Sequence, residues 1–100
     1  MFKYIKTHVG ELLKEEFIIP TNRSINAIAK EIHVHPNRLH EIINNKRKIT
    51  IDTDLRLCKL FGLSDGYFLR IQEHYDIVES KRKLKSELDK IHTINLAHAV

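Results

Sequence analysis

The stretch IAKEIHVHPNRLHEII, residues 28–43, constrains the fold of this chain more than any other part of the sequence. Apolar residues recur at helical spacing on both sides of a short corner that runs from His33 to Pro36. Because Pro36 lacks a backbone N–H, it suits the first turn of the second helix, where that donor would have no partner. Two short amphipathic helices joined by so tight a turn are the pattern of a helix-turn-helix, predicted here over residues 25–44.

The side chains around this corner fit the packing of such a motif. Ala29 is small enough to lie where the two helices cross, and Val34 can fill the corner between them. His33 stands where many such corners carry glycine at a positive φ, a conformation that His tolerates better than most residues. The alternative is a plain helical hairpin inside a bundle, with no role in nucleic-acid binding.

The rest of the chain also reads as helical, so we predict an all-α fold. Two prolines, three glycines and no clear apolar/polar alternation leave little basis for strands. Five helices are expected, each with apolar residues at helical spacing on its inner face. These residues are Val9, Leu12, Leu13 and Phe17; Ile25, Ile28, Ala29 and Ile32; Leu39, Ile42 and Ile43; Leu55, Cys58 and Phe61; and Phe68, Ile71, Tyr75 and Val78.

Residues with turn or capping chemistry mark the expected helix boundaries. Pro20 should end the first helix, and Gly62 should end the fourth. The expected N-caps are Ser24 for the second helix, Thr50 or Asp52 for the fourth, and Ser64 for the fifth.

A second apolar stripe begins late in the chain, at Leu84, Leu88 and Ile91. It either continues the fifth helix or follows a bend near Ser80. We therefore expect the helix-turn-helix domain over residues 1–78 and a C-terminal helical extension over residues 79–100, which is the candidate for part of a dimer contact.

Basic charge is concentrated beside the predicted second helix of the motif. The formal net charge is +4 and the sequence pI is about 9.3, which favours an anionic partner without separating nucleic acid from an acidic protein. The outward residues of that helix are polar: Asn37, Arg38, His40 and Glu41. The segment NNKRK, residues 44–48, follows at once. Polar side chains on an exposed helix can bond base edges, and basic residues beside it can contact phosphates.

Several other classes of site are not predicted, so we expect neither an enzyme nor a bound metal or cofactor. HEIIN, residues 40–44, lacks the second histidine of the zinc-protease motif, and the single cysteine, Cys58, lies at an inward helical position. The longest apolar run is far too short for a membrane span. Met1–Lys6 are not followed by the apolar segment of a secretory signal, so a cytoplasmic protein is expected.

Three segments, HVGELLKEEF, SINAIAKEIHVHPNRLHEIINNKRKITIDTDLRLCKLFG and YFLRIQEHYDI, together resemble the HigA-type antitoxins of the Xre (Cro/cI-like) repressor superfamily. The resemblance runs from about residue 8 to about residue 83. It implies a five-helix Cro/cI-like (lambda-repressor-like) DNA-binding domain. The chain departs from the usual family residues at Val9, His33, Asp54 and Phe68, where Pro, Gly, a small apolar residue and Trp are common.

The resemblance also implies partners and site residues. A homodimer would repress its own operon by binding double-stranded operator DNA, and would neutralise a RelE-like ribonuclease toxin. Three residues align with base-reading positions: Asn37, Arg38 and His40. Five align with positions that contact the DNA backbone: Ser24, Asn26, Asn44, Lys46 and Arg47. His35, on the corner, is expected to face solvent or phosphate and is counted among the candidate DNA-binding residues.

Two acidic clusters are candidate surfaces for binding the toxin. The alternative, given equal weight for each cluster, is that the carboxylates only keep these helix faces hydrated. They are Glu11, Glu15 and Glu16 on the first helix, and Glu73, Asp76 and Glu79 on the fifth. Two other functions remain open: a stand-alone Xre-type repressor without a toxin, and a protein-binding adaptor built on a helix-turn-helix scaffold.

Overall fold

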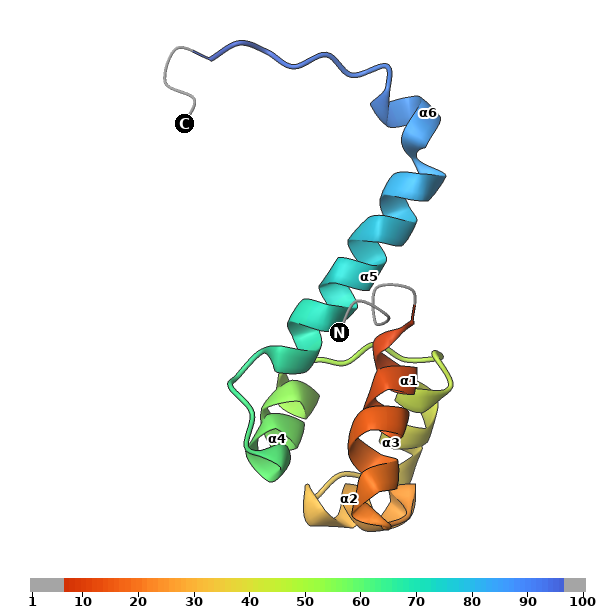
Figure 1. Ribbon diagram of the computed structural model, residues 1–100, viewed down its shortest axis with the longest axis vertical. Coiled ribbons are helices and arrows are strands. Elements are labelled where there is room, and N and C mark those ends of the chain that lie inside the picture. The colour runs from red at the N-terminus through yellow and green to blue at the C-terminus, as the bar shows by residue number, and fades with distance from the viewer. Residues whose placement is uncertain (1–6, 97–100) are drawn as a thin grey trace.

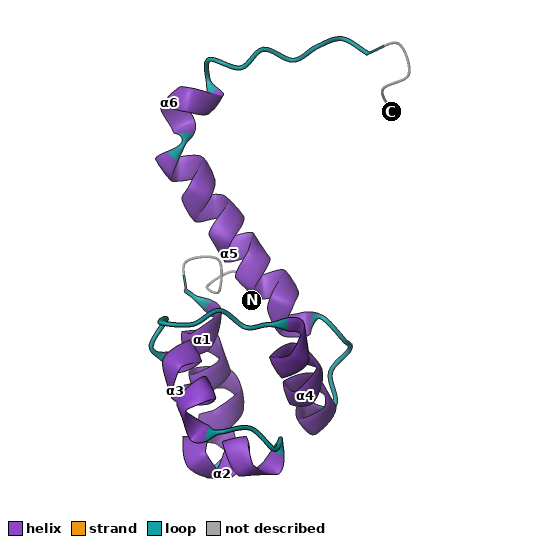
Figure 2. Cartoon of the chain, turned by 180° about the vertical axis from the view of Figure 1, so that it is seen from behind, coloured by secondary structure: helices purple, strands orange, loops and turns teal. Residues whose placement is uncertain are grey.

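The computed structural model describes residues 7–96, and this part of the chain is helical with no strand (Figure 1, Figure 2). The all-α prediction is confirmed. Residues 1–6, on which the expectation about a secretory signal rests, lie outside the described range. The elements are α1 (Val9–Leu12), the π-helical turn η2 (Leu13–Ile18), the 3-10 turn η3 (Ile19–Thr21), α2 (Ile25–Glu31), α3 (Pro36–Ile43), α4 (Ile51–Phe61), α5 (Tyr67–Lys83) and α6 (Lys85–Leu88).

The first four α-helices form a bundle, and α5 starts at this bundle and projects away from it (Figure 1, Figure 2). The molecule is therefore elongated, with principal extents of 52 × 27 × 24 Å. Inside the bundle α3 packs against both α1 and α2, while the start of α5 packs against α1 and α4. This arrangement leaves the outer face of α3 and most of α5 uncovered by other helices.

One apolar core joins the helices of the bundle. Its fully buried large side chains include Leu12, Leu39, Leu57 and Phe68, one from each of four helices. The ring of Phe17 lies 5.2 Å from the ring of Phe68, with the two planes nearly perpendicular, an arrangement that favours aromatic pairs. This pair closes the core between the first helix and the start of α5.

Gly10 is required where α1 crosses α3. A Cβ atom at this position would overlap the backbone carbonyl of Ile42, so the two helices can approach this closely only without a side chain. The backbone of α3 therefore contacts α1 directly, and this contact fixes the position of α3 relative to the rest of the bundle.

Most of the expected helix boundaries are confirmed. Ser24 caps α2 by accepting a 3.0 Å hydrogen bond from the backbone N–H of Ala27. Thr50 caps α4, and Gly62 ends it in the left-handed conformation with φ of +69°. The first helical run, which consists of α1, η2 and η3, ends at Thr21, one residue beyond Pro20.

Leu55 was expected in the core, and this prediction is wrong because the side chain is 43% exposed. The inward face of α4 is formed by Asp54, Leu57 and Cys58. Residues 55 and 57 lie about 200° apart around a helix, so both cannot face the core.

Ser64 does not cap α5, because this helix begins at Tyr67 with Gly66 at the N-cap position. Asp54 provides the cap from α4 instead. Its carboxylate accepts hydrogen bonds from the backbone N–H groups of Gly66, Phe68 and Leu69 at 2.7, 2.9 and 3.1 Å. A helix begins with N–H groups that have no partner within the helix, and a carboxylate is a favourable acceptor for them.

Along α5 the expected apolar stripe loses burial as the helix leaves the bundle. Phe68 is buried, whereas Val78 is 38% exposed. The break in the helix falls at Leu84, four residues beyond the expected bend near Ser80. Because α5 passes residue 78 without interruption, the division of the chain at residues 78 and 79 stays a prediction.

Candidate nucleic-acid interface

The corner between α2 and α3 has the tight geometry that the sequence predicts. The N–H of Val34 donates to the carbonyl of Ala29 at 3.0 Å, and Ala29 is fully buried where the helices meet. His33 has a φ of +62°, which confirms the positive-φ position expected for it. His35 then caps α3 through Nδ1, which accepts the backbone N–H of Asn37 at 3.1 Å.

Arg56 of α4, which is distant in the sequence, forms hydrogen bonds with the backbone of this corner. Its Nη1 donates to the carbonyl oxygen of Ile32 at 2.8 Å and to that of His33 at 3.4 Å. These carbonyls follow the end of α2, where a cation is favourable. This role of Arg56 cannot be predicted from the sequence, because a contact across 24 positions leaves no local signal.

The outward face of α3 follows from the residues it buries. Leu39, Ile42 and Ile43 face the core, so Asn37 and Glu41 lie on the opposite side of the helix. Arg38 and His40 occupy the two flanks between the faces.

Both flanking residues are bonded to neighbouring helices. His40 Nε2 lies 2.8 Å from Oδ1 of Asn26 on α2. Arg38 Nη1 donates to Oδ2 of Asp52 at 2.6 Å and to Oγ1 of Thr53 at 3.3 Å, both at the start of α4. Two of the three predicted base-reading residues are therefore held in place, and Arg38 is directed partly toward α4 rather than straight outward.

Asp52 lies between two guanidinium groups. It accepts hydrogen bonds from Arg38 and, at 3.0 Å, from Nε of Arg56. These bonds, with that from Arg38 the larger effect, hold the pKa of the Asp52 carboxyl below its ordinary value. Asp52 is therefore an anion that two cations share beside α3.

The basic loop after α3 is exposed at Asn44, Lys46 and Arg47. Arg47 forms an ion pair with Glu41 at 2.8 Å, which places a cation over the outward face of α3. The loop is tied to α5 by Gln72, whose side-chain amide exchanges two hydrogen bonds, of 2.7 and 2.9 Å, with the backbone of Ile49.

The predicted residues thus lie at the start of α2, on the corner, along α3 and on the loop that follows it. Arg38, His40 and Asn26 are joined to neighbouring helices, while Asn37 and the side chains of the loop are exposed. This surface has what DNA recognition needs: polar side chains on a protruding helix, with cations beside it. From α4, Asp52 holds the side chain of Arg38, and Arg56 holds the backbone of the corner.

Other kinds of site find no support in the described part of the chain. Over residues 7–96 no three His, Cys, Asp or Glu side chains are placed to hold a metal ion. Cys58 is fully buried, and burial raises the pKa of its thiol, which lowers its reactivity. Among the described helices, none combines the length and the apolar character needed to cross a bilayer.

Comparison with known proteins matches residues 14–68 to the family described as helix-turn-helix. Virulence-associated protein I of Dichelobacter nodosus is 40% identical over 79% of this chain and 73% of its own length. An addiction module antidote protein of the HigA family from Coxiella burnetii has a TM-score of 0.81 at 37% identity, over 90% of this chain and 98% of that one. A Pseudomonas aeruginosa protein solved in complex with its operator DNA has a TM-score of 0.82 at 25% identity, over 87% and 95%.

Proposed function

The chain belongs to the helix-turn-helix family, in its HigA-type Xre (Cro/cI-like) branch, and we propose that it binds operator DNA through α3 to repress its own operon. By family and fold it is a DNA-binding regulator and not an enzyme. The observation that carries the proposal is the protruding face of α3, with Asn37 at its centre and a basic loop at its end. The Pseudomonas aeruginosa neighbour was solved with operator DNA, which supports the same use of this fold here. We place this activity in the cytoplasm.

Two groups of residues have different roles in this proposal. Asn37, Arg38 and His40 read base edges in the major groove, where paired donors and acceptors distinguish the bases. The remaining residues contact phosphate and fix the position of α3 on the duplex. They are Ser24, Asn26, His35, Asn44, Lys46 and Arg47.

Single substitutions separate these roles. Arg38→Ala should cost about 1–3 kcal/mol at one base pair and relax the preference there. Lys46→Ala should weaken binding to every sequence alike and reduce the slope of log affinity against log salt by about one unit. Fluorescence anisotropy with operator and random duplexes measures both effects. Equal losses on the two duplexes for Arg38→Ala would remove it from the base-reading set.

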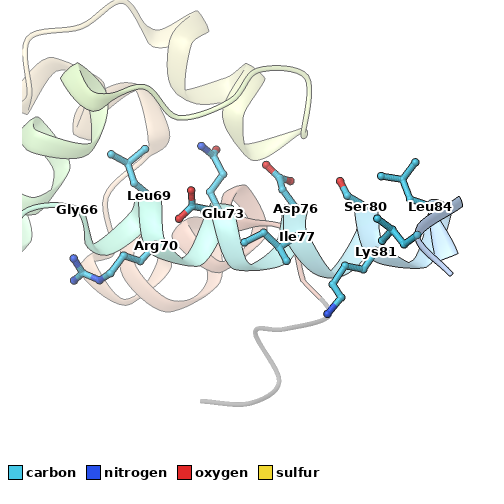
Figure 3. Close-up of a pocket in the computed structure, with 11 residues that line it drawn as sticks. Gly66, Leu69, Arg70, Glu73, Asp76, Ile77, Ser80, Lys81 and Leu84 are labelled. Carbon is cyan, nitrogen blue, oxygen red and sulfur yellow. The ribbon is translucent and has the colours of Figure 1, made fainter. Parts of the chain in front are cut away.

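We propose that the protein acts as a homodimer that pairs along α5. A groove runs along this helix beside Leu69, Ile77 and Leu84 (Figure 3). Ile77 is 50% exposed and Leu84 is 47% exposed, so an apolar surface is open to solvent. A second copy is a partner that could cover both.

The charges along this groove are self-complementary. Glu73 precedes Ile77 by four residues and Lys81 follows it by four, on the same side of the helix. If two α5 helices run antiparallel across a two-fold axis at Ile77, each Glu73 therefore meets Lys81 of the second copy. Two-fold symmetry also suits a palindromic operator with half-sites about one helical turn apart.

Charge reversal tests this pairing by sedimentation equilibrium. Glu73→Lys and Lys81→Glu should each weaken the dimer, because each places like charges together, and the double variant should restore it. A monomer that persists at tens of micromolar, in the range of weak dimers, would contradict the proposal. Failure of the double variant to recover would contradict this register.

We also propose that the protein neutralises a RelE-like ribonuclease toxin by direct contact. The carboxylates of the first helical run are the favoured surface, because Glu11 and Glu15 are exposed and form no ion pair within residues 7–96. The second acidic cluster is partly neutralised, since Asp76 pairs with Lys48 and Glu79 pairs with Arg82. A basic toxin would be attracted more strongly to the unpaired carboxylates.

Co-expression with the toxin encoded by the adjacent gene tests whether the two surfaces are separate. The quadruple change of Asn37, Arg38, Lys46 and Arg47 to Ala should abolish repression and still rescue growth. The matched variant, Glu11→Lys with Glu15→Lys, should keep repression and lose rescue. Loss of rescue by a folded quadruple variant would refute separate surfaces, and an adjacent gene that encodes no toxin would favour a stand-alone repressor.

A further inference from the structure

Arg38, a base-reading residue in the proposed function, is already bonded in the free protein. Its Nη1 donates to Oδ2 of Asp52 at 2.6 Å and to Oγ1 of Thr53 at 3.3 Å. Within residues 7–96 these are its hydrogen bonds, and both leave through one nitrogen. The Nε and Nη2 donors, which lie in one plane, are left for an acceptor outside the protein.

Asp52 can hold Arg38 because Asp52 is itself anchored. The same carboxylate oxygen accepts a 3.0 Å hydrogen bond from Nε of Arg56. Arg56 in turn donates through Nη1 to the carbonyl of Ile32, at 2.8 Å, where the corner of the motif begins. A continuous set of hydrogen bonds therefore joins the corner to the guanidinium of Arg38.

The position of Asp52 also affects where Arg38 can bind. The Asp52 side chain is 55% exposed and that of Arg38 is 32% exposed, so both reach the surface beside α3. A DNA phosphate that approached Arg38 would meet the carboxylate as well, and like charges repel. A guanine edge carries no such charge, and its two acceptors suit a planar pair of arginine donors.

We propose that Asp52 is a positioning residue that makes Arg38 selective for guanine, an inference that rests on the proposed function. Fixed through Nη1, Arg38 presents Nε and Nη2 to O6 and N7 of guanine. Without Asp52 the guanidinium is free to turn to a phosphate, a contact that carries no sequence information. Asp52 thereby lowers affinity for random DNA and raises discrimination at one base pair.

Asp52→Asn tests this inference with a panel of duplexes that vary each base pair of the operator, together with a random duplex. Affinity for the random duplex should rise several-fold, and discrimination at the Arg38 base pair should fall about tenfold. The salt slope should steepen by about one phosphate contact. In an Arg38→Ala background the same change should leave discrimination unaltered.

Asp65→Asn is the matched control, because it removes the same charge from the exposed loop before α5. It should keep the specificity of the unaltered protein, and thermal unfolding of each variant checks that it is folded. Unchanged discrimination in Asp52→Asn, where Arg38→Ala loses it, would overturn the inference and leave the proposed function intact. An equal effect of Asp52→Asn with and without Arg38 would also overturn it. Failure of the unaltered protein to prefer its operator would refute the proposed function itself.

Discussion

Replacement of Asp54 by Ala should destabilise the fold more than any surface change. The side chain is fully buried and accepts three backbone N–H groups that begin α5. Hydrogen bonds to a charged group contribute about 1.5–3 kcal/mol each. The N–H of Phe68 is buried and loses its partner outright, while those of Gly66 and Leu69 are part-buried and partly regain water. We therefore expect a loss of about 4 kcal/mol, a large part of the usual 5–15 kcal/mol.

Urea denaturation followed by circular dichroism measures this loss. Asp54→Asn should cost less, about 2 kcal/mol, because the amide oxygen keeps one acceptor in place without the charge. Asp65→Ala, eleven positions further on and exposed, is the control and should change stability by less than about 0.5 kcal/mol. A loss below about 1 kcal/mol for Asp54→Ala would refute the reasoning, since it would mean that the N–H groups need no buried acceptor.

Three further outcomes follow from the packing and the charges. Gly10→Ala should lower the free energy of unfolding by about 3 kcal/mol or more, because its Cβ meets the backbone of α3. Gly62→Ala has open space around it and should cost only the strain of its positive φ, about 1–2 kcal/mol. Equal losses in urea denaturation would contradict this. Cys58 should resist alkylation by iodoacetamide at neutral pH until the protein is unfolded, because it is buried and its thiol pKa is raised; fast labelling of the native protein would show that the site opens. The pKa of Asp52 is lowered on folding, so its ion pairs stabilise the protein at pH values above the ordinary pKa of 3.8 and cease to do so as the pH falls through the lowered pKa. The stability difference between the unaltered protein and Asp52→Asn should therefore disappear in acid. A difference that grows in acid would contradict this.

Local chemistry accounts for what could be predicted from the sequence. The cap at Ser24, the positive φ of His33 and the end of α4 at Gly62 each depend on one residue and its nearest neighbours. Such features can be read from residue type and spacing. The helical periodicity likewise predicts the core faces of α2 and α3.

Long-range contacts account for what could not be predicted. The sequence predicts Leu55 in the core because apolar residues on both faces of α4 allow two registers, and only packing decides between them. Asp54 caps a helix that begins thirteen positions later, and Arg56 closes a corner formed by α2. In the candidate interface, the resemblance indicates Arg38, but the Asp52 carboxylate that holds it belongs to another helix, 14 positions further along the chain.

Binding of DNA to the face of α3 is the central claim, and a titration followed by ¹⁵N–¹H correlation spectra tests it most directly. The labelled protein is mixed with a duplex taken from the promoter of its own gene, at moderate salt. Shifts should be concentrated at residues 24–26 and 35–47, and the same concentration of a random duplex should give smaller shifts over the same residues. Shifts confined to α4 and α5, with Asn37 and Lys46 unmoved, would contradict the claim.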